Sequence, residues 1–164
     1  MVAKISKNDH PSLDIVSSHG VELTGKKIVL CVAGSVAAYK AIELARLLMR
    51  HGADVTCVAS NAVTKLIQPD YFKWATGNEV ITKLTGELEH IRLADYKQSD
   101  LVIVYPATAN TLGKLANGID DTPISTVLTV GLGAKIPILM CLAMHEAMYD
   151  NSAVKKNLDF LNLV

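Results

Sequence analysis

A chain of 164 residues is long enough for one domain whose core needs neither disulfides nor a structural metal. Basic and acidic residues balance at 16 each, so bulk charge gives no reason to expect a nucleic-acid or membrane-surface partner. No apolar run approaches the roughly 20 residues of a membrane span, and the polar residues 1–14 contain no apolar signal region. We therefore expect a cytoplasmic protein, and an odd number of cysteines agrees with a reducing compartment.

The first part of the chain predicts a peripheral arm, a strand and a helix. Residues 1–26 are polar without a sustained period, and we interpret them as an N-terminal arm. Residues 27–33, KIVLCVA, form an apolar run typical of a strand covered on both faces of a sheet. Apolar residues then recur at helical spacing over 35–51, and Gly52 follows as a helix terminator.

The next segment predicts a second strand beside the first. A strand over 54–59 follows a two-residue link, which is typical of a βαβ crossover and of parallel pairing. A short helix is predicted over 62–67, and Pro69 is expected to stop it. No element is assigned within 70–88, a turn-rich stretch that we expect to be an insertion over one edge of the sheet.

The remaining elements continue the alternation of strand and helix. Strands are predicted over 101–105 and 136–141, and helices over 109–116, 122–130 and 151–161. Gly131 and Gly133 are expected to break the middle helix. This order predicts an α/β fold with a three-layer, doubly wound parallel sheet, Rossmann-like or flavodoxin-like, whose ligands bind outside the carboxyl ends of the strands. We take residues 27–164 as the ligand-binding domain and expect it to be truncated at its C-terminus, because the chain stops where another strand would begin.

Small and polar residues follow the first two predicted strands. Gly34, Ser35 and Val36 open a helix, whose free N–H groups are suited to holding a phosphate. Neither the three-glycine dinucleotide fingerprint nor a Walker loop is present, which favours a mononucleotide. Ser60 follows the second strand and is placed to reach the same phosphate. An ordinary turn and a helix cap explain the same residues on local grounds.

The segment PATANT after the third strand suits a flat ring. Its small residues let a ring lie against the backbone, and Thr108, Asn110 and Thr111 supply hydrogen bonds that fix its orientation. A turn with a threonine cap accounts equally well for it locally. His90 is a candidate for proton transfer near neutral pH, although a lone histidine is more often structural, and His145 follows the fourth strand, where the ligand crevice is expected. Their spacing indicates no metal site.

Together these motifs resemble the homo-oligomeric flavin-containing cysteine decarboxylase family over about residues 25–150. The resemblance depends on their order, namely GSVA at 34–37, Ser60, His90 ahead of a DLVI strand, PATANT at 106–111, and Ala143-Met144 with Met148. Within the family the chain is most similar to the phosphopantothenoylcysteine decarboxylases. His10-Pro11-Ser12 resembles the leading segment of archaeal bifunctional proteins that join this activity to a phosphopantothenate–cysteine ligase.

The resemblance implies a cofactor, a substrate and an assembly. The cofactor is FMN, and the reaction is decarboxylation of 4'-phosphopantothenoyl-cysteine to 4'-phosphopantetheine in coenzyme A biosynthesis. The flavin lies at a subunit interface of a trimer, or of an assembly of trimers. The substrate is oxidised by hydride transfer to FMN, and the resulting thioaldehyde loses carbon dioxide as an enethiol. The family's protonating cysteine lies downstream of AMHEAM, so this chain is expected to accumulate the unsaturated decarboxylated thiol.

The resemblance also implies roles for individual residues. The phosphate is expected at Gly34, Ser35, Val36 and Ser60, and the ring at Thr108, Ala109, Asn110, Thr111 and Ala143. His90 is implied to be the active-site base. Asn110 and His145 are expected to contact the substrate, and His145 replaces a family asparagine that grips the substrate carboxylate, which it would do as a protonated donor.

Three alternatives stay open at this point. One is a flavin prenyltransferase or peptidyl-cysteine decarboxylase relative, which would use a similar fold and flavin site. The second is a non-catalytic FMN-binding regulatory protein. The third is a nucleotide-binding module without a flavin.

Overall fold

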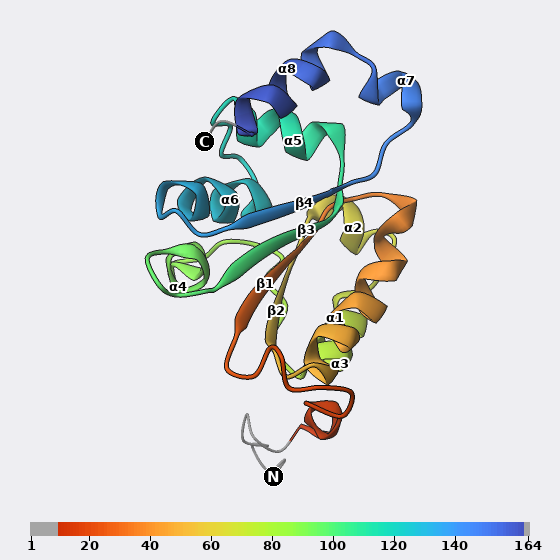
Figure 1. Cartoon of the computed structure of the whole chain (residues 1–164), viewed down its shortest axis with the longest axis vertical. Helices are drawn as coiled ribbons and strands as arrows, with labels where there is room; N and C mark the ends of the chain where they lie inside the picture. Colours follow the sequence, from red (N-terminus) through yellow and green to blue (C-terminus); the bar gives the residue numbers. More distant parts are fainter. Residues whose placement is uncertain (1–9, 163–164) are drawn as a thin grey trace.

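Four parallel strands form the centre of the structure, a computed structural model that describes residues 10–162 (Figure 1). Their order in the sheet is β2-β1-β3-β4, and their bounds are Lys27–Val32 for β1, Asp54–Ala59 for β2, Leu101–Ala107 for β3 and Ile138–Leu142 for β4. Every neighbouring pair is parallel. The predicted α/β fold with a parallel sheet is therefore confirmed.

Helices cover both faces of the sheet (Figure 1). Their bounds are Pro11–Ile15 for η2, Val36–Tyr39 for η3, Lys40–Arg50 for α1, Asn61–Thr64 for α2, Pro69–Thr76 for α3, Glu89–Ala94 for α4, Ala109–Ala116 for α5, Pro123–Gly133 for α6, Glu146–Tyr149 for α7 and Ser152–Leu161 for α8. The short turns η2 and η3 are 3₁₀ helices. The arrangement has three layers, with the sheet in the middle.

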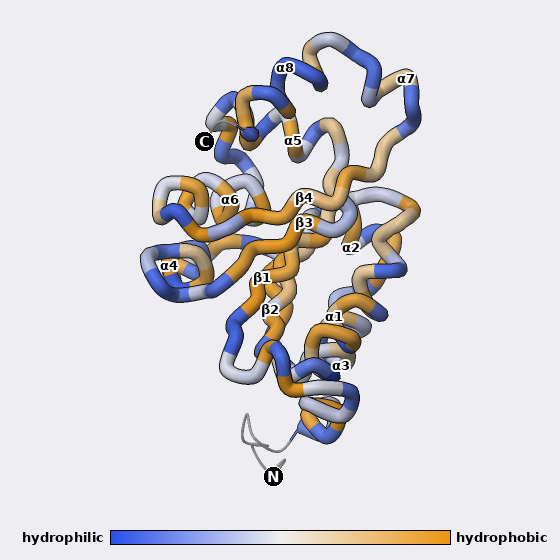
Figure 2. Tube along the Cα trace, viewed as in Figure 1, coloured by the Kyte–Doolittle hydropathy of each residue, from blue (hydrophilic) through white to orange (hydrophobic). Residues whose placement is uncertain are grey.

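Alternate residues of β1 enter two separate cores, one on each face. Leu30 and Val32 pack with residues of α1 and α3, whereas Val29 and Cys31 pack with residues of α4 and α6. Figure 2 shows the strands as predominantly apolar, with polar residues on the helices and loops around them. Burial on both faces explains why β1 is a continuous apolar run in the sequence.

Two cysteines of the sheet are buried free thiols. Cys31 in β1 and Cys57 in β2 are fully buried. Burial raises the pKa of the Cys57 thiol to about 12 and also raises the pKa of Cys31. Because only a thiolate is a good nucleophile, both side chains act as small apolar core residues.

The segment between β2 and β3 is more ordered than the sequence indicated. Pro69 begins α3 instead of only stopping the preceding helix, because proline is well suited to the first helical turn. Phe72 and Ala75 of α3 are fully buried in the core that also holds α1. Beyond α3, Ile81 forms a parallel bridge with Val58. The expected insertion is thus part of the core and of the sheet edge.

Other boundaries also differ from the prediction: α2 is shorter, β4 begins later, and α6 and β3 run further than expected. Gly131 and Gly133 lie inside α6, which runs to Gly133 instead of breaking near Val130. Val127 and Leu128 of this helix are fully buried, and their burial outweighs the roughly 1 kcal/mol by which a glycine disfavours a helix. Strand β3 continues through Pro106, which follows a cis peptide bond, to Ala107.

The described part of the predicted N-terminal arm, residues 10–26, contacts α1 and α3. The backbone N–H of Ser17 donates to Met49 O at 3.1 Å, and that of Leu23 donates to His51 O at 2.8 Å. The buried Ser12 hydroxyl donates to the carbonyl of Trp74. Residues 1–9 of the arm lie outside the described residues.

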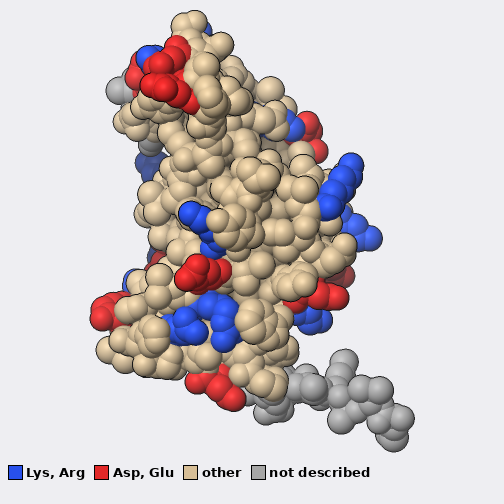
Figure 3. Space-filling view, turned by 90° about the vertical axis from the view of Figure 1, so that its right-hand side faces the viewer, with Lys and Arg blue, Asp and Glu red and all other residues tan. Residues whose placement is uncertain are grey.

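The face of the molecule that carries α1 has both signs of charge. Figure 3 shows Lys and Arg side chains close to Asp and Glu side chains on this face. Within residues 10–162, no helix has the length and apolar character needed to cross a membrane. The same residues contain no group of three or more His, Cys, Asp or Glu side chains arranged to hold a metal ion.

Candidate functional site

A hollow of about 330 Å³ lies at the carboxyl ends of β1, β2 and β3. It is lined by Ala33, Gly34, Ser60, Asn61, Ala62, Thr108, Ala109, Asn110, Thr111, Lys114, Thr122, Ile124, Ser125 and Met148. The structure therefore brings together six of the predicted cofactor residues, namely Gly34, Ser60 and 108–111. Ligand pockets in proteins are typically about 300–1,000 Å³, so this hollow is at the small end of the range.

Two small residues of the lining, Gly34 and Ala62, approach each other closely. A Cβ atom added at Gly34 would lie 2.5 Å from the Cβ of Ala62. Gly34 lies in the loop after β1, and Ala62 is in α2, so this loop and α2 meet at the contact. No larger side chain fits at position 34 unless the loop or the helix moves.

The hydroxyl groups of the hollow also cap helices. Ser60 Oγ accepts a hydrogen bond from Val63 N at 3.1 Å, at the start of α2. Thr108 Oγ1 accepts from Thr111 N at 3.3 Å, at the start of α5, and lies 3.2 Å from Thr111 Oγ1. The local interpretation as caps is therefore correct. A hydroxyl that accepts from the backbone still has a proton to donate, so capping and ligand binding are compatible.

Sequence reasoning did not single out Lys114 of α5 or the start of α6, which also line the hollow. Lys114 Nζ lies 2.7 Å and 2.9 Å from the two carboxylate oxygens of Asp121. This hydrogen bond and the lysine charge hold the pKa of Asp121 below its usual value. Thr122 and Ser125 form a capping box that begins α6.

Two sequence signals for these residues were present. Lys114 follows Asn110 by four residues, and side chains at this spacing share one face of a helix. Thr122 and Ser125 stand directly before an apolar run, at the spacing of a capping box. Both signals become useful only when the ligand end of the sheet is known.

The two other residues predicted at the phosphate, Ser35 and Val36, follow Gly34 but do not line the hollow. Ser35 caps η3, since its Oγ accepts from Ala37 N at 3.3 Å, and η3 leads directly into α1. The side chain of Val36 is 88% exposed.

The segment after β4 returns to the hollow. Ala143 N donates to Ala107 O at 2.8 Å, which holds this segment beside the start of α5. His145 caps α7, because its Nδ1 accepts from Ala147 N at 3.2 Å. The side chain of Met148 lines the hollow, whereas those of Ala143 and His145 do not.

His90 lies away from the hollow of its own chain. It belongs to α4, which precedes β3 and packs against α6 near the amino end of the strand (Figure 1). Its Nδ1 atom is buried and has no hydrogen-bond partner within the described chain. The structure thus does not place this histidine with the other predicted site residues.

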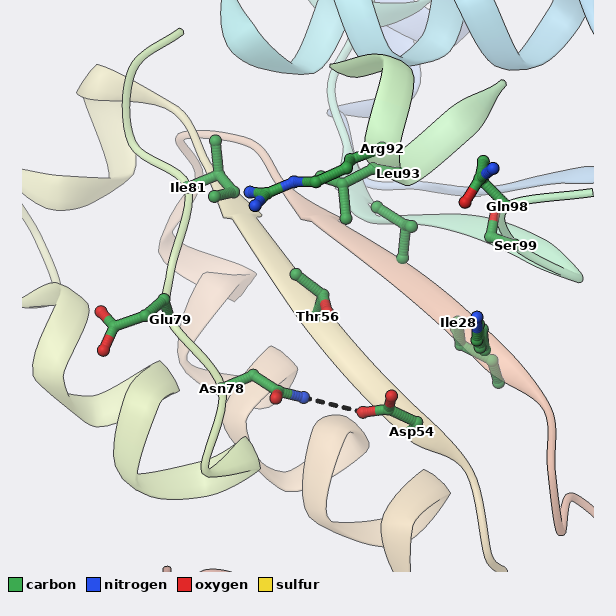
Figure 4. Close-up of a pocket in the computed structure, with 12 residues that line it drawn as sticks. Ile28, Asp54, Thr56, Asn78, Glu79, Ile81, Arg92, Leu93, Gln98 and Ser99 are labelled. Atoms are coloured by element: carbon green, nitrogen blue, oxygen red, sulfur yellow. Dashed lines mark hydrogen bonds between the residues drawn. The ribbon is translucent and has the colours of Figure 1, made fainter. Parts of the chain in front are cut away.

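A second depression, of about 380 Å³, lies at the opposite ends of β1 and β2 (Figure 4). Figure 4 shows Arg92 of α4 and Asp54 of β2 on its wall. Asn78 donates to Asp54 Oδ1 and to Val55 O, both at 2.8 Å, so its amide protons serve the fold. This depression contains none of the predicted site residues. It also lies away from the carboxyl ends of the strands, where ligands of such sheets bind.

Comparisons with known proteins identify relatives of this chain. Residues 16–163 match the model of a family described as "Flavoprotein". The chain is 49% identical over 149 residues to the coenzyme A biosynthesis bifunctional protein CoaBC of Thermococcus kodakarensis, covering 90% of this chain and 37% of that protein. It is 36% identical over 141 residues to a probable phosphopantothenoylcysteine decarboxylase of Streptococcus mutans, covering 83% of this chain and 77% of the relative.

A solved structure gives the same result for the fold. The FMN-dependent cysteine decarboxylase SpaF superimposes with a TM-score of 0.76 at 26% identity, covering 86% of this chain and 81% of that one. The chain spans little more than a third of the length of the bifunctional relatives that it matches.

Proposed function

The chain belongs to the flavoprotein family, and we propose that it binds FMN and serves the decarboxylation of 4'-phosphopantothenoyl-cysteine to 4'-phosphopantetheine in coenzyme A biosynthesis. The observation that carries this proposal is the hollow at the carboxyl ends of β1, β2 and β3. Its lining combines small residues with hydroxyl and amide groups in the order of the family motifs. The name of the Streptococcus relative supports the substrate, and that of the Thermococcus relative supports a role in coenzyme A biosynthesis.

The residues of the hollow fit a flavin mononucleotide. Gly34 and Ala62 both line the hollow, and their small size leaves the backbone at its wall open to a ligand. Ser60 and Thr108 keep hydroxyl protons that can be donated to phosphate or carbonyl oxygens. Such a lining of small residues and a few convergent polar groups is typical of cofactor sites.

We assign the two ends of the site from the elements that carry them. Gly34, Ser35, Val36 and Ser60 would hold the phosphate, because they surround the start of η3 and α2. Residues 108–111 and Ala143 would line the ring, since the Ala143–Ala107 hydrogen bond joins the segments that carry them. Bound FMN would supply a hydride acceptor, while the chain's own residues orient the substrate and exclude water.

His90 would act as the base, and this role requires a neighbouring subunit. The side chain lies away from its own hollow, and its buried Nδ1 has no partner within residues 10–162. A copy of the chain packed against α4 would bring a second hollow to His90. This geometry supports the proposed trimer, or assembly of trimers, with sites between subunits.

His145 would donate a hydrogen bond to the substrate carboxylate, with Asn110 as the second contact. Because His145 Nδ1 accepts from Ala147 N, the ring in this arrangement carries its proton on Nε2. The neutral ring can therefore donate, and the protonated form expected from the sequence is not required. For the cellular location we propose the cytoplasm, supported by the two buried free thiols.

The test is a binding and turnover experiment on the purified chain. FMN is added to the protein, and binding is followed by quenching of flavin fluorescence. The loaded protein is then incubated with 4'-phosphopantothenoyl-cysteine, and mass spectrometry searches for a product that has lost carbon dioxide. Binding together with this product is the expected result. Binding without any change in the substrate would favour a regulatory protein, and failure to bind FMN would refute the proposal.

A further inference from the structure

Lys114 introduces a charge into an otherwise neutral hollow. Among the described residues that line the hollow, it is the only one with a formal charge. It lies one helical turn after Asn110 on α5, and therefore on the same face of the helix. Its side chain is only 20% exposed. A cation in this position acts on whatever lies beside Asn110.

Asp121 holds this lysine in one orientation. Both carboxylate oxygens contact Lys114 Nζ, and the Asp121 backbone N–H donates to Ser125 Oγ at 3.1 Å, which fixes the acid to the start of α6. The Asp121 side chain is 56% exposed and does not line the hollow. The pair is therefore asymmetric, with its positive member on the inside and its negative member toward solvent.

Resting on the function proposed above, we infer that Lys114, positioned by Asp121, makes the site bind reduced FMN more tightly relative to oxidised FMN. Two-electron reduction adds electron density, and in the anionic form a negative charge, to the flavin ring. A nearby cation stabilises that charge, and charge near the ring nitrogens is one way in which a protein tunes a flavin. The consequence is a higher reduction potential, which favours oxidation of the thiol substrate by the bound flavin.

A purely structural ion pair makes a different prediction. Ion pairs with solvent access contribute about 0–1 kcal/mol to stability, so removing either partner would have a small effect of the same sign on folding. Charge tuning predicts opposite effects on the potential. Loss of Lys114 removes the cation, whereas loss of the Asp121 charge leaves the cation uncompensated.

The experiment measures the midpoint potential of the FMN-loaded protein against a reference dye. We expect Lys114→Gln to lower the ratio of reduced to oxidised FMN affinity about tenfold, which corresponds to about 30 mV for a two-electron couple. Asp121→Asn should raise that ratio, and Lys114→Arg should leave it close to the wild-type value. Lys155→Gln is the matched control, because Lys155 forms an ion pair with Asp150 and does not line this hollow.

The outcomes separate this inference from the proposed function. Equal potentials in Lys114→Gln and the wild-type protein, or shifts of the same sign in Lys114→Gln and Asp121→Asn, would overturn the inference alone. Loss of FMN binding in a folded Lys114→Gln variant would also overturn it, since the residue would then serve binding. A wild-type protein that binds no FMN would refute the proposed function and this inference together. Circular dichroism verifies the fold of each variant.

Discussion

Substituting Gly34 by alanine tests how the hollow is built. The new Cβ would lie 2.5 Å from the Cβ of Ala62, whereas ordinary contacts between such atoms are 3.4–4 Å. The loop after β1 and helix α2 would have to separate by about 1 Å, and overpacking of this kind costs about 1–3 kcal/mol. We expect a lower free energy of unfolding and weaker FMN binding, because both walls of the proposed phosphate end are displaced.

A compensating substitution makes the prediction specific. Ala62→Gly removes the atom that the new Cβ meets, and the next nearest atoms are backbone atoms of residue 62 at 3.3 Å and 3.4 Å. The double variant should therefore recover most of the lost stability and affinity. Gly133→Ala is the matched control, since a Cβ at that position has no heavy atom within 4 Å.

The assays are denaturant unfolding and fluorescence titration with FMN. Each variant is measured by both methods, so that a loss of binding can be separated from a loss of fold. The reasoning would be refuted if Gly34→Ala bound FMN as tightly as the wild-type protein. It would also be refuted if Ala62→Gly failed to rescue a destabilised Gly34→Ala variant.

Three further predictions follow from individual contacts. Ser60→Ala removes the cap of α2 and should lower the free energy of unfolding in urea by about 0.5–2 kcal/mol and also weaken FMN binding. A variant that loses only stability, or only FMN affinity, would contradict the double role of Ser60. His145→Ala should raise the dissociation constant of the substrate about tenfold with FMN affinity unchanged, as measured by calorimetry, because it removes one hydrogen bond to the carboxylate; unchanged substrate binding would remove that role. Hydrogen bonds from Thr85 lower the pKa of Glu89 to about 2. The ionised Glu89 side chain therefore stabilises the fold fully above pH 4.5, and this contribution is lost as pH falls toward 2. Between pH 4.5 and 2, the urea midpoint of Glu89→Gln should fall less steeply than that of the wild-type protein. The same pH dependence in both proteins would contradict this role of Glu89.

The strands were predictable because each is marked by an apolar run in its own segment of the sequence. Strand β2 has the predicted bounds, and β1 differs by one residue at its end, since a strand buried on both faces is apolar along its length. The helix over Ala109–Ala116 also has the predicted bounds, because its threonine cap and apolar spacing adjoin in sequence.

The missed elements depend on tertiary contacts. Pro69 is compatible with the end of one helix and the start of another, and only the burial of Phe72 against α1 decides between them. Gly131 disfavours a helix locally, yet packing of α6 on the sheet continues the helix past it. Local sequence carries no record of such packing.

The candidate site was predictable to a similar extent. Residues that directly follow strands, such as Gly34, Ser60 and Thr108, were found because parallel strands end at one side of a sheet. Lys114 lies a full turn inside α5, and its place in the hollow depends on how α5 packs beside α6. The position of His90 away from the hollow depends on where α4 lies, which no local pattern indicated.

A crystal structure of the protein soaked with FMN would show whether the hollow at the ends of β1, β2 and β3 is the flavin site. We expect one FMN per chain, with its phosphate between Gly34 and Ser60 and its ring against residues 108–111. A well-ordered crystal in which this hollow stays empty under saturating FMN, or in which the flavin binds elsewhere, would contradict this expectation.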